Sequence, residues 1–251
     1  MELHISFYKT LSDLSRIPVY IDDTKRLDYP KGVVVNGTIY AEELNYPKKH
    51  DITYLLGSKY IPIRKEFWNI PDKAINESLQ TIMITFGGDD ARNMTPRIIT
   101  MLNGNYPELN KKVIIGKAFT NTEQIQAFKD KTTEFIYYPD AEGMKKVMLE
   151  SDIAISAAGQ TLYELARLGV PTIAVAVADN QINNVRGWQK AGFIEYAGWW
   201  EDMLILENMK TSLEKLTNNN LRLDKYHIGK MFVDGKGAIR IIDEIMKKNE
   251  I

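Results

Sequence analysis

The segment 151–187 places the strongest constraint on the fold, because an apolar strand, a turn of very small residues and an amphipathic helix follow one another directly. The strand is predicted at 153–155, and the turn at 156–159 has almost no side chain. Apolar residues at helical spacing cover 161–168, and Gly169 ends the helix. A helix that starts directly after a strand offers unpaired N–H groups and a positive dipole end, which suit a phosphate.

The same alternation of strand and helix extends through most of the chain. Helical patterns are predicted at 95–102, 123–129 and 141–149. The predicted strands lie at 82–86, 112–115, 133–137, 153–155 and 172–177. Alternation at this spacing predicts a parallel α/β sheet, whose ligands bind outside the carboxyl ends of the strands.

Glycine-rich or polar turns follow several of these strands. Gly87, Gly88 and Asp89 follow the first strand, and Asn180 and Gln181 follow the last. We expect these turns to converge with the small-residue turn on one cleft. Each also has a plainer interpretation, since paired glycines allow a tight connection and amides often cap loops.

Residues 1–67 contain too few elements for an independent doubly wound domain. A helix is predicted at 5–15, and strands at 18–21, 33–35 and 54–56. Such a domain normally has about five or six strands, so this part is typical of the second half of one. Asp22, at the end of a strand, is a weak catalytic candidate, with turn capping as the alternative.

These patterns divide the chain into a partial N-terminal lobe, 1–70, and a nucleotide-binding lobe, 71–251. A final helix at 238–248 has Ile239, Ile242 and Met246 on an apolar face, and we expect it to return to the first lobe.

Composition excludes several functions. The net charge of −1 gives no field for nucleic acid, and no apolar run approaches a membrane span, so we expect a cytoplasmic protein. There are no cysteines and only three histidines, His4, His50 and His227, none in a metal-ligand spacing. We therefore expect neither a metal nor a cofactor. No GxxxxGK[ST] loop is present, which argues against ATP hydrolysis of the P-loop kind.

The segment 151–192 resembles the donor-nucleotide half of GT-B glycosyltransferases. It is most similar to the UDP-2,4-diacetamido-2,4,6-trideoxy-altropyranose hydrolases of pseudaminic acid synthesis and the related spore-coat polysaccharide proteins. Further landmarks occur in family order: Ile21-Asp22-Asp23, Leu55-Leu56-Gly57-Ser58-Lys59-Tyr60, Arg64-Lys65-Glu66-Phe67, Phe86-Gly87-Gly88-Asp89 and Asp234-Gly235-Lys236-Gly237-Ala238. Members begin with a GxGHxxR turn that carries the catalytic histidine, and this chain has no such turn.

The resemblance implies roles for individual residues. The turn Ala158, Gly159, Gln160 and Thr161 would hold a diphosphate, and Glu164 would accept the hydroxyls of the uridine ribose. The other implied contacts are Tyr137 and Tyr138 beside the base, Asn180 and Gln181 facing the sugar, and Gly87, Gly88 and Asp89 bordering sugar and phosphate. Asp89 and Asp22 are the remaining weak candidates for a base, and Glu164 alone could also be a solvated helix residue.

We therefore predict a GT-B-like α/β protein with an incomplete N-terminal lobe. It would bind UDP or a UDP-sugar, and it would resemble a hydrolase that releases UDP from a diacetamido-trideoxy sugar for surface polysaccharide synthesis. Without the family histidine, we expect weak or no activity unless an upstream segment or subunit completes the lobe. A GT-B glycosyltransferase and a non-catalytic sugar-nucleotide-binding subunit are the alternatives.

Overall fold

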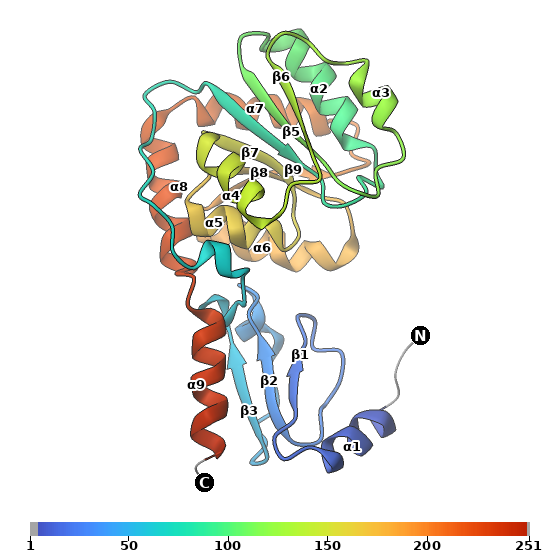
Figure 1. Ribbon diagram of the computed structural model, residues 1–251, viewed down its shortest axis with the longest axis vertical. Coiled ribbons are helices and arrows are strands. Elements are labelled where there is room, and N and C mark those ends of the chain that lie inside the picture. The colour runs from blue at the N-terminus through green and yellow to red at the C-terminus, as the bar shows by residue number, and fades with distance from the viewer. Residues whose placement is uncertain (1–4, 250–251) are drawn as a thin grey trace. The chain divides into compact units, whose positions relative to one another are not determined.

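The computed structural model describes residues 5–249, which form two compact units. The larger is Arg64–Met231, and the smaller combines the chain up to Ile63 with the chain from Phe232 onward (Figure 1).

The larger unit is built on a six-stranded, fully parallel sheet in the order β6-β5-β4-β7-β8-β9. Its strands are β4 (Thr81–Thr85), β5 (Asn110–Ile115), β6 (Thr133–Tyr137), β7 (Ile153–Ala157), β8 (Thr172–Ala176) and β9 (Ile194–Trp199). Its helices are α2 (Met94–Asn105), α3 (Thr122–Gln126), α4 (Ala141–Glu150), α5 (Thr161–Leu168), α6 (Ile182–Ala191), α7 (Ile205–Leu216) and α8 (Asn219–Phe232), with short 3-10 turns η3 (Lys65–Phe67) and η4 (Asp179–Gln181). The α/β fold class predicted from the alternation is confirmed.

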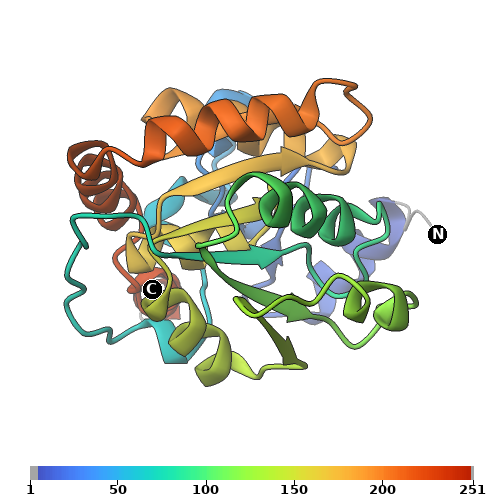
Figure 2. The ribbon, with the colours of Figure 1, turned by 90° about the horizontal axis from the view of Figure 1, so that it is seen from above.

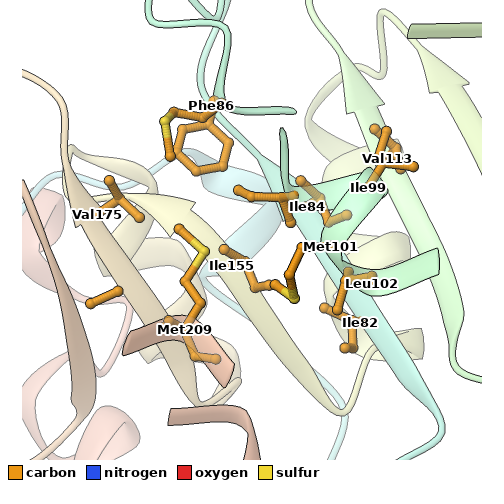
Figure 3. Packing of buried hydrophobic residues seen from close by; sticks show 14 of the residues in the cluster. Ile82, Ile84, Phe86, Ile99, Met101, Leu102, Val113, Ile155, Val175 and Met209 are labelled. Carbon is orange, nitrogen blue, oxygen red and sulfur yellow. The ribbon is translucent and has the colours of Figure 1, made fainter. Parts of the chain in front are cut away.

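Helices cover both faces of this sheet, so its strands are continuously apolar. Figure 2 shows α2 and α7 on one side and α4 on the other. Side chains from α2 and α7, such as Ile99 and Met209, pack with Ile84, Ile155 and Val175 in the main core (Figure 3). Burial on both faces explains why β4, β7 and β8 lack the alternation of a half-exposed strand.

Buried polar groups attach the segment before β4 to the sheet. The Asp152 carboxylate accepts hydrogen bonds from the Asn76 amide and from the backbone N–H groups of Gln80 and Thr81, at 2.7, 2.8 and 2.8 Å. Lys73 donates to the carbonyls of Ser151 and Met148 in the same region. These contacts fix the start of β4.

The burial of Lys73 predicts a pH dependence of stability. Burial lowers the pKa of its ammonium group to about 8, whereas an unfolded lysine titrates near 10.4. Between about pH 8 and 10.4 the unfolded chain therefore binds more protons than the folded one, and stability rises with pH. Urea denaturation across this pH range should show the free energy of unfolding rising with pH in the wild type but not in Lys73→Met. The same pH dependence in both proteins would contradict a buried Lys73 that loses its proton near pH 8.

The smaller unit has a three-stranded parallel sheet, β1 (Val19–Ile21), β2 (Gly32–Asn36) and β3 (Ile52–Leu56), in that order. Its other elements are α1 (Ile5–Leu14), α9 (Gly237–Asn249), η1 (Ala41–Leu44) and η2 (Ser58–Tyr60). Ile241 and Ile245 of α9 pack on Val33, Val35 and Leu55 of the sheet.

The apolar face of α9 noted in the sequence is not the face that packs. Ile239, Ile242 and Met246 are exposed, and the helix packs through Ile241 and Ile245 instead. The helix carries two adjacent apolar stripes, and sequence periodicity alone does not select between them. A Cβ atom on Gly237 would lie 2.1 Å from the Ile61 carbonyl oxygen, so the close approach of the helix start to Ile61 requires glycine there.

Candidate functional site

The two predicted glycine turns lie side by side where the strand order of the large sheet reverses. β4 leads outward to β5 and β6, β7 leads the other way to β8 and β9, and Thr85 of β4 is in register with Ser156 of β7. Gly87, Gly88 and Asp89 follow β4 and are exposed, whereas Ala158 and Gly159 follow β7. In open α/β sheets, ligands bind at such a reversal, outside the carboxyl ends of the strands.

The turn after β7 leads directly into α5 and is held from behind by two buried side chains. The Asn184 amide donates to the carbonyl oxygens of Ala158 and Gly159 at 2.8 and 3.3 Å, and the Tyr163 hydroxyl donates to the Asn184 amide oxygen at 2.6 Å. These bonds turn the carbonyls toward the protein, and the positive end of the α5 dipole lies at Thr161, where the helix begins. Such a helix start suits an anion.

Asn184 was missed by sequence reasoning. The sequence feature that could have indicated it is the place of this polar residue on the apolar, buried face of α6, beside Val185 and Trp188.

The turn after β4 is shaped by a third glycine, at the carboxyl end of β5. Gly87 has a φ of +76°, which glycine adopts without strain. The backbone N–H of Ala118 donates to the Gly88 carbonyl at 2.9 Å, and a Cβ atom on Gly116 would lie 2.3 Å from that oxygen. Gly116 was also missed, because a single glycine after a strand has no distinctive sequence signal.

Gln181 lies against the small-residue turn. Its amide oxygen accepts from the Val177 backbone N–H at 2.9 Å, and its amide nitrogen is 3.6 Å from the position of a Cβ atom on Gly159. Asn180 precedes it in η4 and is exposed.

The Glu164 carboxylate forms an ion pair with Arg64. The Arg64 guanidinium donates to both oxygens of the Glu164 carboxylate, at 2.6 and 2.7 Å, and the glutamate side chain is only 12% exposed. This hydrogen bonding, together with the negative charge of Glu164, raises the pKa of Arg64. Glu164 is therefore not the solvated helix residue that the sequence left open, and a ligand hydroxyl would share its carboxylate with Arg64.

Tyr137 and Tyr138 lie farther along the same edge. Tyr137 is the last residue of β6, which is two strands away from β4, and Tyr138 follows it. Both rings are exposed, Tyr137 accepts from the Gln126 amide at 2.8 Å, and Tyr138 has a φ of +51°. The structure therefore does not place them beside the reversal point.

The two candidate bases have different surroundings. Asp22, in the smaller unit, is buried and accepts from the backbone N–H groups of Thr24 and Arg26 and from the Tyr29 hydroxyl. Burial raises the pKa of Asp22, but these hydrogen bonds outweigh it and the net shift is downward. This geometry is that of a turn cap, so the catalytic interpretation of Asp22 is not supported. Asp89 is exposed at the glycine turn, and its carboxylate accepts a long hydrogen bond, 3.4 Å, from the Ala91 backbone N–H.

Among residues 5–249, no three side chains of histidine, cysteine, aspartate or glutamate are grouped as metal ligands. Nor does any helix there combine the length and apolar character needed to cross a bilayer.

The fold and the arrangement of its turns are those of a GT-B-like glycosyltransferase lobe. Residues 81–234 match the glycosyltransferase family 28 C-terminal domain, and the chain belongs to this family.

Individual relatives agree with this assignment. The chain is 27% identical over 188 residues to the pseudaminic acid cytidylyltransferase and UDP-2,4-diacetamido-2,4,6-trideoxy-beta-L-altropyranose hydrolase of Helicobacter pylori, a match covering 74% of this chain and 34% of the relative. It is 23% identical over 176 residues to the spore coat polysaccharide biosynthesis protein SpsG of Bacillus subtilis, covering 68% of this chain and 51% of the relative. The resemblance to these proteins noted in the sequence is confirmed. The chain thus spans between a third and about half of these relatives.

The crystal structure of MurG from Acinetobacter baumannii has a similar fold. It superposes with a TM-score of 0.66 at 18% identity, covering 97% of this chain and 76% of MurG. The family match makes the chain a glycosyltransferase-like protein, and one of its relatives is a polysaccharide biosynthesis protein.

Proposed function

We propose that the larger unit binds UDP or a UDP-sugar, with the diphosphate at the start of α5. The observation that carries the proposal is the meeting of two glycine turns, at Gly87-Gly88 and Ala158-Gly159, where the sheet order reverses. Backbone can approach a ligand closely at both turns, and the N-terminus of α5 favours negative charge. The hydrolase named in the Helicobacter relative acts on a UDP-linked diacetamido sugar, which supports the choice of uridine.

Ligand-dependent thermal unfolding tests this proposal. Ligand at ~100 times its dissociation constant stabilises the folded state by about 2.7 kcal/mol. We expect UDP to raise the unfolding midpoint and ADP to do so much less. The absence of a UDP-dependent shift at millimolar ligand would contradict the proposal.

Glu164 provides a sharper test because it reports on the ribose. We expect Glu164→Ala to weaken UDP several-fold, since ribose hydroxyls lose their acceptor. In the wild type, 2′-deoxy-UDP should bind more weakly than UDP, and this difference should shrink in the variant, as titration calorimetry can measure. Glu142→Ala, which removes an exposed carboxylate paired with Lys145 on α4, is the matched control. If Glu164→Ala left the affinity difference between UDP and 2′-deoxy-UDP unchanged, Glu164 would have only the structural role of its ion pair with Arg64.

For catalysis, we propose hydrolysis of a UDP-sugar that depends on a base supplied from outside the described residues. His50 and His227 are exposed and neither follows a strand of the large sheet. General-base catalysis typically contributes about 10²- to 10⁴-fold, so the chain alone should turn over feebly. A GT-B glycosyltransferase, with a sugar acceptor in place of water, and a non-catalytic binding subunit remain the alternatives.

The small sheet has an exposed edge on which a further strand could complete the N-terminal lobe. β1 is one of the two edge strands of this sheet, with Val19 and Ile21 40% and 63% exposed, and a groove of about 340 Å³ lies along it, lined in part by Leu11 and Tyr29. We propose that a strand carrying the GxGHxxR turn pairs with β1. Adding such a segment from a hydrolase relative should restore UDP release, and Ile21→Lys should block the restoration. If both pieces fold but UDP release is not restored, the alternative of a non-catalytic sugar-nucleotide-binding subunit would be favoured.

A further inference from the structure

A large cavity lies in the smaller unit, at the end of the small sheet where its strands begin. The cavity has a volume of about 650 Å³, and Pro18, Gly32 and Asp51, at the starts of the three strands, form one wall. Residues of α1 and the last turn of α9 form the others (Figure 1). This volume is within the range of small-molecule sites, about 300–1,000 Å³.

Backbone contacts hold the three strand starts in place. The Gly32 N–H donates to the Asp51 carbonyl at 2.8 Å, and the Val33 N–H donates to the Pro18 carbonyl at 2.9 Å. A Cβ atom on Gly32 would lie 2.2 Å from the Pro18 carbonyl oxygen, so the close approach of the first two strands requires glycine there. This wall of the cavity is therefore formed before any ligand binds.

Positive side chains outnumber negative ones around the cavity. Four basic residues line it, against two acidic ones: Lys9, Arg16, Lys31 and Lys248, with Asp13 and Asp51. Among residues 5–249, no carboxylate lies within ion-pair distance of any of the three lysines. A cleft lined by an excess of one charge attracts ligands of the opposite charge, so this cavity favours an anion.

Ser12 provides an independent indication of a ligand. This residue of α1 is buried, with 1% of its surface exposed, and it lines the cavity. Its Oγ atom has no hydrogen-bond partner within residues 5–249. The hydroxyls of Thr10 and Ser15 on the same helix instead donate to the carbonyls four residues before them. A buried hydroxyl without a partner costs free energy, which a ligand oxygen in the cavity would recover.

We propose that this cavity binds a sugar phosphate. Lysine ammonium groups and the Ser12 hydroxyl are donors for phosphate oxygens, whereas the carboxylates of Asp13 and Asp51 accept from sugar hydroxyls. The cavity is larger than a phosphate ion, which favours a phosphate carried on a larger polar group. The site belongs to the smaller unit, so the proposal does not rest on the nucleotide site proposed for the larger one.

Calorimetric titration with glucose 6-phosphate, inorganic phosphate and glucose tests this site. We expect glucose 6-phosphate to bind more tightly than inorganic phosphate, and glucose to bind far more weakly than either. Lys31→Gln should weaken both phosphate-containing ligands about three- to tenfold, since each loses a charged donor. Lys59→Gln is the matched control, because it removes an exposed lysine that follows β3 at the other end of the same sheet. It should weaken neither ligand.

Ser12→Ala should change stability and affinity in opposite directions. Without ligand, the variant should unfold at the same or a higher urea concentration than wild type, because the lost hydroxyl has no partner within residues 5–249. Its affinity for glucose 6-phosphate should fall about tenfold, the typical effect of losing a hydrogen bond to a charged group. A merely structural role of Ser12 would lower stability and affinity together.

Asp13→Ala separates the two parts of the ligand. Removal of a repelling carboxylate should strengthen the binding of inorganic phosphate. Glucose 6-phosphate also loses an acceptor for its hydroxyls, so its advantage over inorganic phosphate should shrink. Equal affinities of the wild type for these two ligands would reduce the site to one for phosphate alone and overturn the assignment of a sugar.

Other outcomes would overturn the site itself. Equal losses of affinity in Lys31→Gln and Lys59→Gln would indicate nonspecific attraction between charges. Glucose 6-phosphate that UDP displaces and that Ser12→Ala does not weaken would belong to the nucleotide site. If the folded wild type bound neither phosphate-containing ligand, this inference would be refuted, whereas UDP binding, measured separately, would still decide the proposed function.

Discussion

Replacing Gly116 with alanine is expected to destabilise the larger unit by about 2–3 kcal/mol, at the upper end of the usual cost of overpacking. The new Cβ atom would lie 2.3 Å from the Gly88 carbonyl oxygen and 2.7 Å from the Gly88 Cα atom. Both are backbone atoms, so no side-chain rotation relieves the clash. The displaced Gly87-Gly88 turn should also lose affinity for UDP, beyond the loss of stability measured by denaturation.

The same substitution at Gly104 is the matched control. Gly104 lies on the exposed side of α2, and a Cβ atom there would meet nothing within 4 Å. Since alanine is the better helix former, Gly104→Ala should stabilise the protein by about 0.5 kcal/mol and leave UDP binding unchanged. A Gly116→Ala protein that is as stable as wild type and binds UDP with the same affinity would contradict the close approach of Gly116 to Gly88.

Removal of the Asp152 carboxylate is expected to have the largest effect on stability. Asp152→Ala deletes the acceptor of three hydrogen bonds that hold Asn76, Gln80 and Thr81. It also removes the negative charge that favours the charged forms of Lys73 and Arg222. Breaking such a buried charge network typically costs about 3–5 kcal/mol, which chemical denaturation should detect.

Asp72 offers a comparison within the same segment. Its side chain is 100% exposed, and its Oδ1 atom lies 3.4 Å from the Nζ atom of Lys230. An exposed ion pair contributes little, so Asp72→Ala should leave the unfolding midpoint unchanged. Similar losses for Asp72→Ala and Asp152→Ala would show that burial of the Asp152 network does not matter.

Local patterns predicted the large sheet well. Continuous apolar runs separated by helical spacing identified β4 to β8, because parallel strands buried on both faces have this composition. The boundaries were less accurate. α2 begins at Met94 rather than Thr95 because the buried Asp90 carboxylate accepts from the N–H groups of Met94 and Thr95.

Contacts between residues far apart in the chain could not be predicted in this way. Arg64 and Glu164 are 100 positions apart, and neither has a local signal of the ion pair. The support of Ala158 by Asn184 and the approach of Gly116 to Gly88 likewise depend on packing of separate βα units. Sequence patterns thus located the turns of the candidate site, whereas the long-range contacts that shape those turns emerged only from the structure.

Amide hydrogen exchange in the presence and absence of UDP tests the central claim most directly. The account predicts slower exchange of backbone amides at the turns 87–93 and 158–164, with a further effect at 177–181. Peptides from the amino-terminal edge of the sheet, such as 129–132, should be unchanged. Protection confined to other parts of the chain, or none at saturating UDP, would contradict a nucleotide site at the reversal point between β4 and β7.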